Sequence, residues 1–122
     1  MEKNYSKLIE ETVEKNKQKY IDHLLKLVSI DTHDIGHGIE GGLEGNGQEY
    51  LMQVFEELNA DKIEKDPLKE ESILKCNELY GEGNTGHNYD NRFNVYAEIK
   101  GRSDKSLLFN GHIDHMPADN LE

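Results

Sequence analysis

The residues of this chain that are best suited to chemistry are His112 and Asp114, which directly follow an apolar run. One residue separates them, so an extended backbone would point both side chains to the same face. A neutral imidazole can bind a metal ion, and a nearby carboxylate fixes the tautomer of that imidazole and raises its basicity. A catalytic zinc ion normally takes three protein ligands, so the pair in isolation favours a structural histidine over a metal ligand.

The apolar run at residues 107–109 must position this pair. Three consecutive large apolar side chains are typical of a strand that is buried on both faces, and Gly111 would let the backbone turn tightly after such a strand. In open α/β sheets, ligand sites lie beyond the carboxyl ends of the strands. We therefore expect residues 111–117 to form one wall of an active site.

A second strand is predicted immediately before this run. Residues 93–100 alternate between apolar and polar side chains, which is the period of a half-buried strand. The polar residues 101–104, which begin with a glycine, suit a turn between this strand and residues 106–110. The sequence therefore predicts an antiparallel hairpin over residues 93–110.

Earlier in the chain, apolar residues recur every three or four positions, which predicts helices over residues 1–30, 47–59 and 70–79. Asn46 is the expected N-cap of the second helix, and Glu49 could complete a capping box three residues later. The apolar stripe of this helix is predicted to be core. Residues 61–65 are expected to form no more than a short edge strand.

The segment at residues 31–47 is predicted to be an irregular loop, because it holds six of the eleven glycines. His33, Asp34 and His37 lie in it, and with His87 they could be interpreted as a metal-binding cluster. We favour a polar, glycine-rich loop, because such a loop explains these residues equally well and His87 has no partner nearby in the sequence.

Cys76 is the only cysteine, so an intrachain disulfide is impossible and a reducing compartment, the cytoplasm, is the simpler expectation. We expect its thiol to be a small buried hydrophobe, since no flanking residues suggest thiolate activation. His23 is expected at the surface or boundary of the first helix. The first twenty residues contain no apolar signal region, and no stretch is apolar enough for a membrane span, so a soluble protein is expected.

The composition narrows the classes of partner. The net charge is −11, from 25 acidic and 14 basic residues, which argues against binding to nucleic acid or to an anionic membrane. Only 34% of the residues are hydrophobic, which is lean for a domain that buries a sheet and its covering helices. Part of the core is therefore expected to be missing from this chain.

Several segments, taken in order, resemble the M20 family of metallopeptidases, the group of acetylornithine deacetylase, succinyl-diaminopimelate desuccinylase and aminoacylase. The family signature is an apolar strand that runs into Gly-His-x-Asp, followed shortly by Pro, and residues 107–117 are similar to it. The other similar segments are residues 20–30 (first helix), 47–58 (second helix), 90–95 (entry to the next strand) and 100–101 (Lys-Gly turn).

This resemblance implies that His112 ligates one ion of a two-metal site, usually zinc with cobalt as an alternative, and that Asp114 is the catalytic acid that orients the imidazole. It implies hydrolysis of an N-acyl amino acid or small peptide by metal-bound water. The implied fold is the N-terminal portion of an α/β zinc-peptidase domain, with two helices packed on a small sheet that includes the hairpin. A homodimer is expected only of the full-length protein.

The chain also departs from the family. His115 and Met116 replace an apolar pair; His115 could add a ligand, but an outward-facing side chain is preferred. The remaining ligands, the general base and the lid domain are expected beyond residue 122, so the chain alone is expected to be inactive. The alternative is a non-catalytic interaction module of the same fold that pairs through an exposed sheet edge. Leu121 and Glu122 are either native or the remnant of an expression-tag junction.

Overall fold

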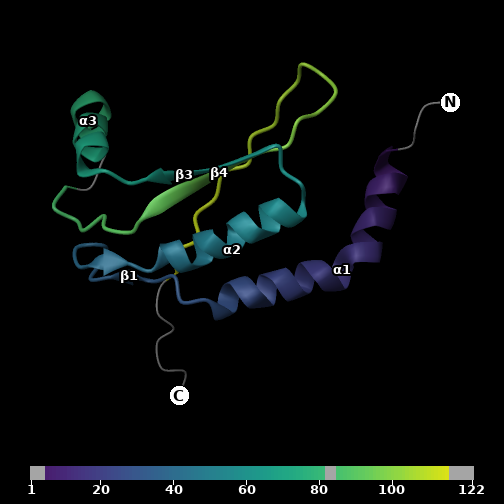
Figure 1. The fold of residues 1–122 in the computed structure, drawn as a ribbon, viewed down its shortest axis with the longest axis horizontal. Coiled ribbons are helices and arrows are strands. Elements are labelled where there is room, and N and C mark those ends of the chain that lie inside the picture. Colours follow the sequence, from purple (N-terminus) through teal and green to yellow (C-terminus); the bar gives the residue numbers. More distant parts are fainter. Residues whose placement is uncertain (1–4, 82–84, 116–122) are drawn as a thin grey trace. The chain divides into compact units, whose positions relative to one another are not determined.

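A computed structural model describes residues 5–81 and 85–115 of the chain (Figure 1). Within these residues, three helices and two small antiparallel sheets form a mixed α/β fold. The elements, in order, are α1 (Tyr5–Ser29), β1 (Asp34–Ile35), β2 (Gly41–Gly42), α2 (Glu44–Glu57), β3 (Lys62–Pro67), α3 (Glu70–Tyr80) and β4 (Phe93–Glu98). The chain divides into two compact units, residues 1–30 and residues 31–122.

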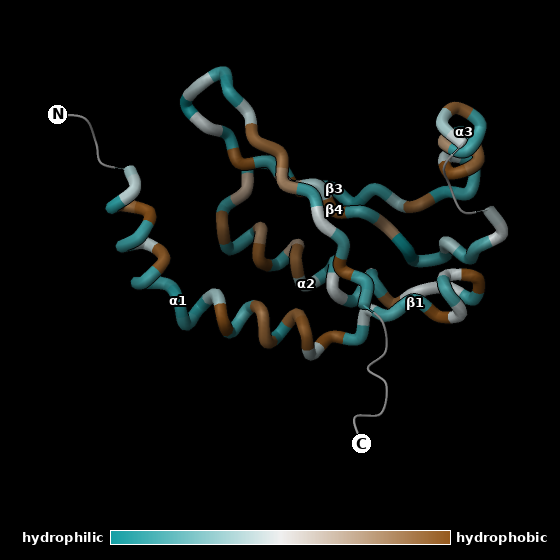
Figure 2. Tube along the Cα trace, turned by 180° about the vertical axis from the view of Figure 1, so that it is seen from behind, coloured by the Kyte–Doolittle hydropathy of each residue, from teal (hydrophilic) through white to brown (hydrophobic). Residues whose placement is uncertain are grey.

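Helix α1 makes up the described part of the first unit and confirms the helix predicted there. Polar pairs one turn apart support it: Lys7 Nζ lies 3.7 Å from Glu11 Oε1, and the Gln18 amide donates a hydrogen bond of 2.9 Å to Asp22. Its apolar stripe, visible as brown segments in Figure 2, is exposed at Leu8, Ile9, Val13, Ile21, Leu24, Leu25 and Val28. None of the helices in the described ranges is long and apolar enough to cross a membrane.

The larger sheet of the second unit pairs β3 with β4 in antiparallel register, with Ile63 opposite Ala97 and Lys65 opposite Val95. Helix α2 packs against both strands. Half-buried apolar side chains fill this contact; they are Tyr50, Leu51, Val54 and Phe55 from α2, with Ile63, Phe93 and Val95 from the strands. The apolar stripe of the second helix thus lies where the sequence predicted, although Leu58 at its end is exposed.

The predicted hairpin over residues 93–110 is wrong. Residues 106–110 form no strand, and the partner of β4 is β3, the segment expected to be no more than a short edge strand. The observed ladder has six residue pairs and is extended by backbone hydrogen bonds from Asp61 to Glu98 (2.8 Å) and from Leu68 to Arg92 (2.9 Å). This longer ladder satisfies more backbone groups than a five-residue second strand would.

Helix α2 begins at Glu44, earlier than predicted, and the expected capping box at its start is wrong. Leu43 occupies the N-cap position without a capping side chain. The Asn46 amide instead donates a hydrogen bond of 3.1 Å to the carbonyl of Asp31, and Glu49 pairs with Lys65 of β3. The two side chains expected to cap the helix therefore connect it to neighbouring segments.

The glycine-rich segment is more ordered than the irregular loop that was predicted. Strands β1 and β2 pair in antiparallel register, with Asp34 opposite Gly42 and Ile35 opposite Gly41. The turn between them contains three successive residues of positive φ, at Gly36 (59°), His37 (54°) and Gly38 (84°). Glycine is the residue that adopts this conformation without strain, which explains part of the local glycine content.

Helix α3 confirms the third predicted helix. It ends at Gly81, whose φ of 69° is the left-handed conformation common just after a helix, and Asn59 (φ 54°) follows α2 in the same way. Helix α3 packs extensively against no other described element, so Leu74, Leu79 and Tyr80 are exposed.

Among the described residues, no apolar side chain is fully buried. Thr32, which is 2% exposed, is the largest side chain that is fully enclosed. The low hydrophobic content of the sequence thus agrees with the lack of fully buried apolar side chains in the described residues. The most enclosed point of the second unit lies beside Thr32, next to the segment that carries His112 and Asp114.

Candidate functional site

The predicted pair, His112 and Asp114, lies in an extended segment without regular secondary structure. His112 Nδ1 and Asp114 Oδ1 are 3.1 Å apart, within hydrogen-bonding distance. The imidazole is 85% exposed, and its other ring nitrogen is not engaged by any hydrogen bond that the structure records in the described residues. The carboxylate can therefore fix the orientation of a ring whose Nε2 remains available.

The apolar run before this pair is not a buried strand, which corrects the expectation from sequence. Leu107, Leu108 and Phe109 are 78%, 86% and 86% exposed. The strand that was expected to pair with them is β4, which pairs with β3 instead. Residues 110–113 form neither a turn nor a bend, so the tight turn expected at Gly111 is absent.

A second imidazole–carboxylate pair, formed by Asp31 and His33, was not predicted. The ring Nδ1 of His33 hydrogen-bonds Asp31 Oδ1, and the His33 backbone N–H donates to the same oxygen at 3.3 Å. The hydrogen bond from the His33 ring holds the pKa of the Asp31 carboxyl below its ordinary value. Asp31-Thr32-His33 has the spacing of the later pair with the two residue types reversed, a signal that was available in the sequence.

Three contacts bring the two pairs to neighbouring positions. The Thr32 hydroxyl donates a hydrogen bond of 2.8 Å to the carbonyl of Ile113. His33 and His115 form a parallel β-bridge, and their rings stack with centroids 6.3 Å apart and planes at 8°. His115, expected to face outward, therefore has a defined partner although it is exposed. Met116 and Pro117 of the motif, and Leu121 and Glu122, lie outside the described residues.

A separate cluster joins the smaller sheet to α2 and to the start of β4. Arg92 Nη2 lies 2.9 Å from Asp34 Oδ1 and also hydrogen-bonds Glu44 Oε1. The side chains of Arg92 and Glu44 are each 12% exposed, so this is a largely buried ion cluster. Burial first, and then the neighbouring Asp34 carboxyl group, raise the pKa of Glu44 above its ordinary value, while Arg92 acts in the opposite direction.

The glycine-rich turn packs closely against this cluster at Gly38. A Cβ on Gly38 would lie 3.1 Å from Arg92 Nη1 and 3.2 Å from His87 Cδ2. Three buried polar atoms in this cluster and beside it have no hydrogen-bond partner within the described residues: Glu44 Oε2, Arg92 Nε and, beside the cluster, His87 Nδ1. The cluster fastens three segments together, and its geometry assigns it a structural role.

The structure does not gather the histidines of the glycine-rich loop into a metal cluster. Asp34 is engaged by Arg92, His37 is exposed in the turn, and the His87 ring lies 6.3 Å from the Tyr89 ring. His23 is half-buried on α1, as a boundary residue would be, and Cys76 is exposed. The expected burial of Cys76 was wrong, because α3 has no element packed closely over it.

His112 and Asp114 together do not provide the ligands of a complete zinc site. A catalytic zinc ion normally takes three protein ligands. Within residues 5–81 and 85–115, no group of three or more His, Cys, Asp or Glu side chains could hold a metal ion. Within the described residues, His112 and Asp114 therefore form an imidazole–carboxylate pair that belongs to no larger group of ligating side chains.

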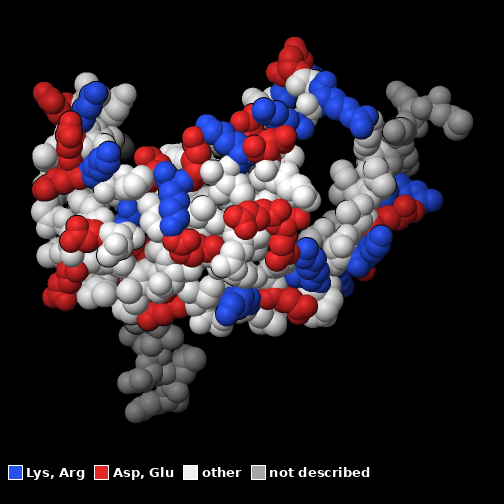
Figure 3. Space-filling view, in the orientation of Figure 1, with Lys and Arg blue, Asp and Glu red and all other residues white. Residues whose placement is uncertain are grey.

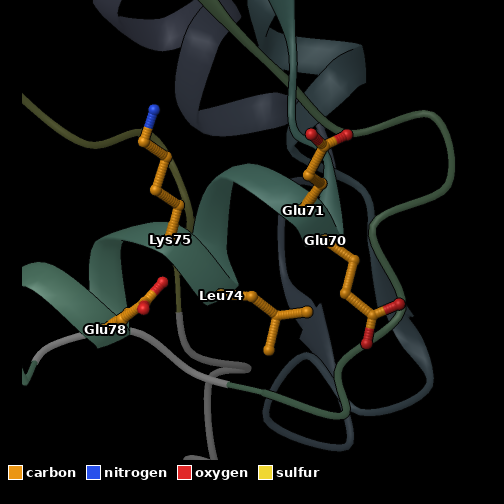
Figure 4. Close-up of a pocket in the computed structure, with 5 residues that line it drawn as sticks. All are labelled: Glu70, Glu71, Leu74, Lys75 and Glu78. Carbon is orange, nitrogen blue, oxygen red and sulfur yellow. The ribbon is translucent and has the colours of Figure 1, made fainter.

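A surface hollow of about 470 Å³ lies along α3 and is lined by Glu70, Glu71, Leu74, Lys75 and Glu78 (Figure 4). All five side chains come from a single helix. Acidic and basic side chains are interspersed over the face drawn in Figure 3. The hollow therefore looks like ordinary solvated helix surface, and it contains none of the predicted site residues.

The observations define a small mixed α/β protein in which two imidazole–carboxylate pairs lie on adjoining segments. Comparison of the chain with protein-family models, with curated proteins and with solved structures found no match.

Proposed function

We propose that this chain is the N-terminal part of the catalytic domain of a metal-dependent amide hydrolase of the M20 type. The observation that carries the proposal is the contact of 3.1 Å between His112 Nδ1 and Asp114 Oδ1. It leaves Nε2 of an exposed imidazole as the metal-binding atom and gives the carboxylate the orienting role that outer-shell partners of metal ligands have. The order of motif segments along the sequence supports the same assignment.

In this proposal, His112 holds one of two ions, which are zinc or cobalt. The bound metal would supply a water molecule of lowered pKa for attack on the amide carbonyl of an N-acyl amino acid or small peptide. Asp114 would accept a hydrogen bond from Nδ1–H of His112, which leaves Nε2 without a proton and directed at the ion. The described residues offer one ligand and no paired general base, so we expect no hydrolysis by this chain alone.

Zinc titration of the ¹⁵N-labelled chain, followed through the imidazole resonances, tests the ligand. We expect the Nε2 resonance of His112 to shift first, and Asp114→Asn to weaken zinc binding by about 10-fold or more, as is typical of outer-shell partners. His23→Ala removes a histidine on α1 and is the matched control. A titration in which all six histidines respond equally, or in which His112→Ala changes nothing, would contradict the proposal.

Assays of acyl-amino-acid hydrolysis with added zinc or cobalt test the second half of the proposal. We expect no turnover above the buffer rate, because one ligand leaves the metal without the geometry that activates water. Turnover that is abolished by His112→Ala would show that the chain completes its own site.

A non-catalytic interaction module is the second candidate function, and one observation favours it. Leu107, Leu108 and Phe109 project from a segment that follows β4, and the second edge of β4 has no partner strand among the described residues. An exposed edge beside apolar side chains is suited to strand addition by another chain. Sedimentation analysis with Leu108→Lys decides this for a second copy: a concentration-dependent dimer of the parent chain that the substitution abolishes would support the module.

A further inference from the structure

The most enclosed contact of the second unit ties the segment at residues 31–33 to the segment at residues 112–115. Thr32 is almost completely buried and donates its hydroxyl hydrogen bond to the carbonyl of Ile113. Gly47 of α2 closes the site from a third side, since a Cβ there would lie 2.5 Å from Ile113 Cδ1 and 2.7 Å from Thr32 Cγ2. The backbone at Ile113 is therefore held at a point where little relaxation is available.

A second contact holds the other side of Asp114. The His33 ring is fixed in its plane by the Asp31 carboxylate, and the His115 ring stacks on it with planes at 8°. Aromatic rings at this separation attract each other when they are suitably offset. The parallel bridge between His33 and His115 adds backbone pairing at the same place. Asp114 thus lies between two held residues, Ile113 and His115.

His112 depends on this arrangement through Asp114. The imidazole is highly exposed, and Asp114 is the one hydrogen-bond partner that the structure records for it in the described ranges. If the Asp114 backbone moved, the His112 imidazole would consequently lose its fixed orientation. Residues 31–33 restrain Ile113 and His115, these two residues restrain Asp114 between them, and Asp114 restrains the His112 ring.

We propose that Asp31, Thr32 and His33 are positioning residues for the pair His112 and Asp114. The metal-binding consequence of this role rests on the proposed function, while the positioning itself needs no metal. None of the three residues is required to touch a substrate or an ion. Their role is to hold a solvent-exposed imidazole in one orientation before any ligand arrives, which is the preorganisation that a binding site requires.

The metal-free chain tests this directly by NMR, through the tautomer of the His112 ring and the amide exchange of residues 112–115. We expect His33→Ala and Thr32→Val each to speed this exchange by about three- to tenfold, the effect of losing one ordinary hydrogen bond or stacked pair. The signature of the tautomer that Asp114 fixes in His112 should weaken in both variants. His37→Asn, an exposed histidine of the same segment at a positive φ that Asn tolerates, is the matched control.

His33→Phe separates the stacking from general damage to the fold. Phe keeps an aromatic ring against His115 but loses the ring hydrogen bond to Asp31, so exchange at residues 112–115 should fall between that of the parent chain and that of His33→Ala. Circular dichroism of each variant must match the parent for the comparison to count. Unchanged exchange and tautomer in both His33→Ala and Thr32→Val would overturn the proposal, as would a His33→Phe variant that keeps its circular dichroism and behaves like His33→Ala.

Addition of zinc distinguishes this inference from the proposed function. If zinc fails to shift His112 in the parent chain, the metal role fails, and the positioning role is still judged from the metal-free spectra. If zinc shifts His112 equally in the parent chain and in His33→Ala, the metal role stands and the positioning role fails. A shift that needs about tenfold more zinc in His33→Ala would support both.

Discussion

Asp31 and Glu44 are two carboxylic acids whose surroundings change their pKa in opposite directions. The hydrogen bond from the His33 ring lowers the pKa of Asp31 from 3.8, and burial followed by the neighbouring Asp34 carboxyl group raises the pKa of Glu44 from 4.5. Folding therefore favours the charged form of Asp31 and the protonated form of Glu44.

These shifts predict opposite pH dependences of stability. Asp31 contributes stability above its ordinary pKa that is lost as pH falls through the lowered value; Glu44 contributes stability below its ordinary pKa that is lost as pH rises through the raised value. Urea unfolding from about pH 2.5 to about pH 7 measures both. Asp31→Asn should be less stable than the parent at the upper end only, and Glu44→Gln should gain stability relative to the parent as pH rises. Equal slopes for the two variants would contradict the assignment.

Arg92 is the residue whose loss should be felt most widely, because it bonds Asp34 and Glu44 at once. We predict that Arg92→Ala lowers the free energy of unfolding by about 2 kcal/mol, the scale of a hydrogen bond to a charged group in a largely buried place. The pKa of Glu44 should rise further, since the opposing effect of the guanidinium disappears. Denaturant unfolding and a ¹³C carboxyl titration measure these effects, and Arg102→Ala, at an exposed arginine, should have little effect on either.

At the scale of elements, Gly47 lets α2 lie close to the segments that carry Thr32 and Ile113, because it has no side chain. Alanine is intrinsically favoured over glycine inside a helix by about 1 kcal/mol, so Gly47→Ala would be stabilising on helix propensity alone. Its Cβ would instead press on Ile113 Cδ1 and Thr32 Cγ2, and we predict a net loss of about 1–3 kcal/mol, as for an overpacked site. Gly111→Ala, where a Cβ meets nothing within 4 Å, is the control; a stabilising Gly47→Ala would show that Ile113 and Thr32 can move away.

Local sequence patterns predicted the helices well, since α1, α2, α3 and the end of α3 at Gly81 follow from apolar period and glycine placement. They failed for the sheet, because the alternation of residues 93–100 indicates a strand without naming its partner. Its partner in the structure is β3, which is separated from β4 in the sequence by α3 and a loop. This pairing depends on all six residue pairs of the ladder and not on a local pattern. Predicted capping at Asn46 failed for a similar reason: its amide bonds a residue fifteen positions away.

For the candidate site too, contacts between residues close in sequence were predicted, and contacts between distant residues were not. His112 and Asp114 are close in sequence, and their contact was foreseen from spacing. The stacking of His33 on His115, and the buried ion cluster at Arg92, join residues far apart in the chain and had no local signal. Only the Asp-x-His spacing of residues 31–33 could have suggested that the earlier segment resembles the later one.

At the scale of the whole molecule, the acidic charge and the sparse core act together. With a net charge of −11, the surplus acidic side chains repel one another in the compact state. The described residues contain no fully buried apolar side chain that would offset this repulsion. We predict that raising sodium chloride from about 0.05 M to about 0.5 M stabilises the fold by screening this repulsion. Thermal unfolding midpoints measure the effect, and a variant with Glu71→Gln and Glu78→Gln on exposed α3 should show a smaller salt response. A parent chain that salt destabilises would contradict this account.

The hydrogen bond between Thr32 and Ile113 closes a span of 81 residues, and this length governs when it can form. The entropy lost on closing a loop grows with its length, so contacts between distant residues form reliably only once the intervening elements have become compact. Helices α2 and α3 and the β3–β4 ladder should therefore precede it during folding. A chain halted just before this step would have its native helices and sheet, yet its imidazole–carboxylate pairs would still be apart.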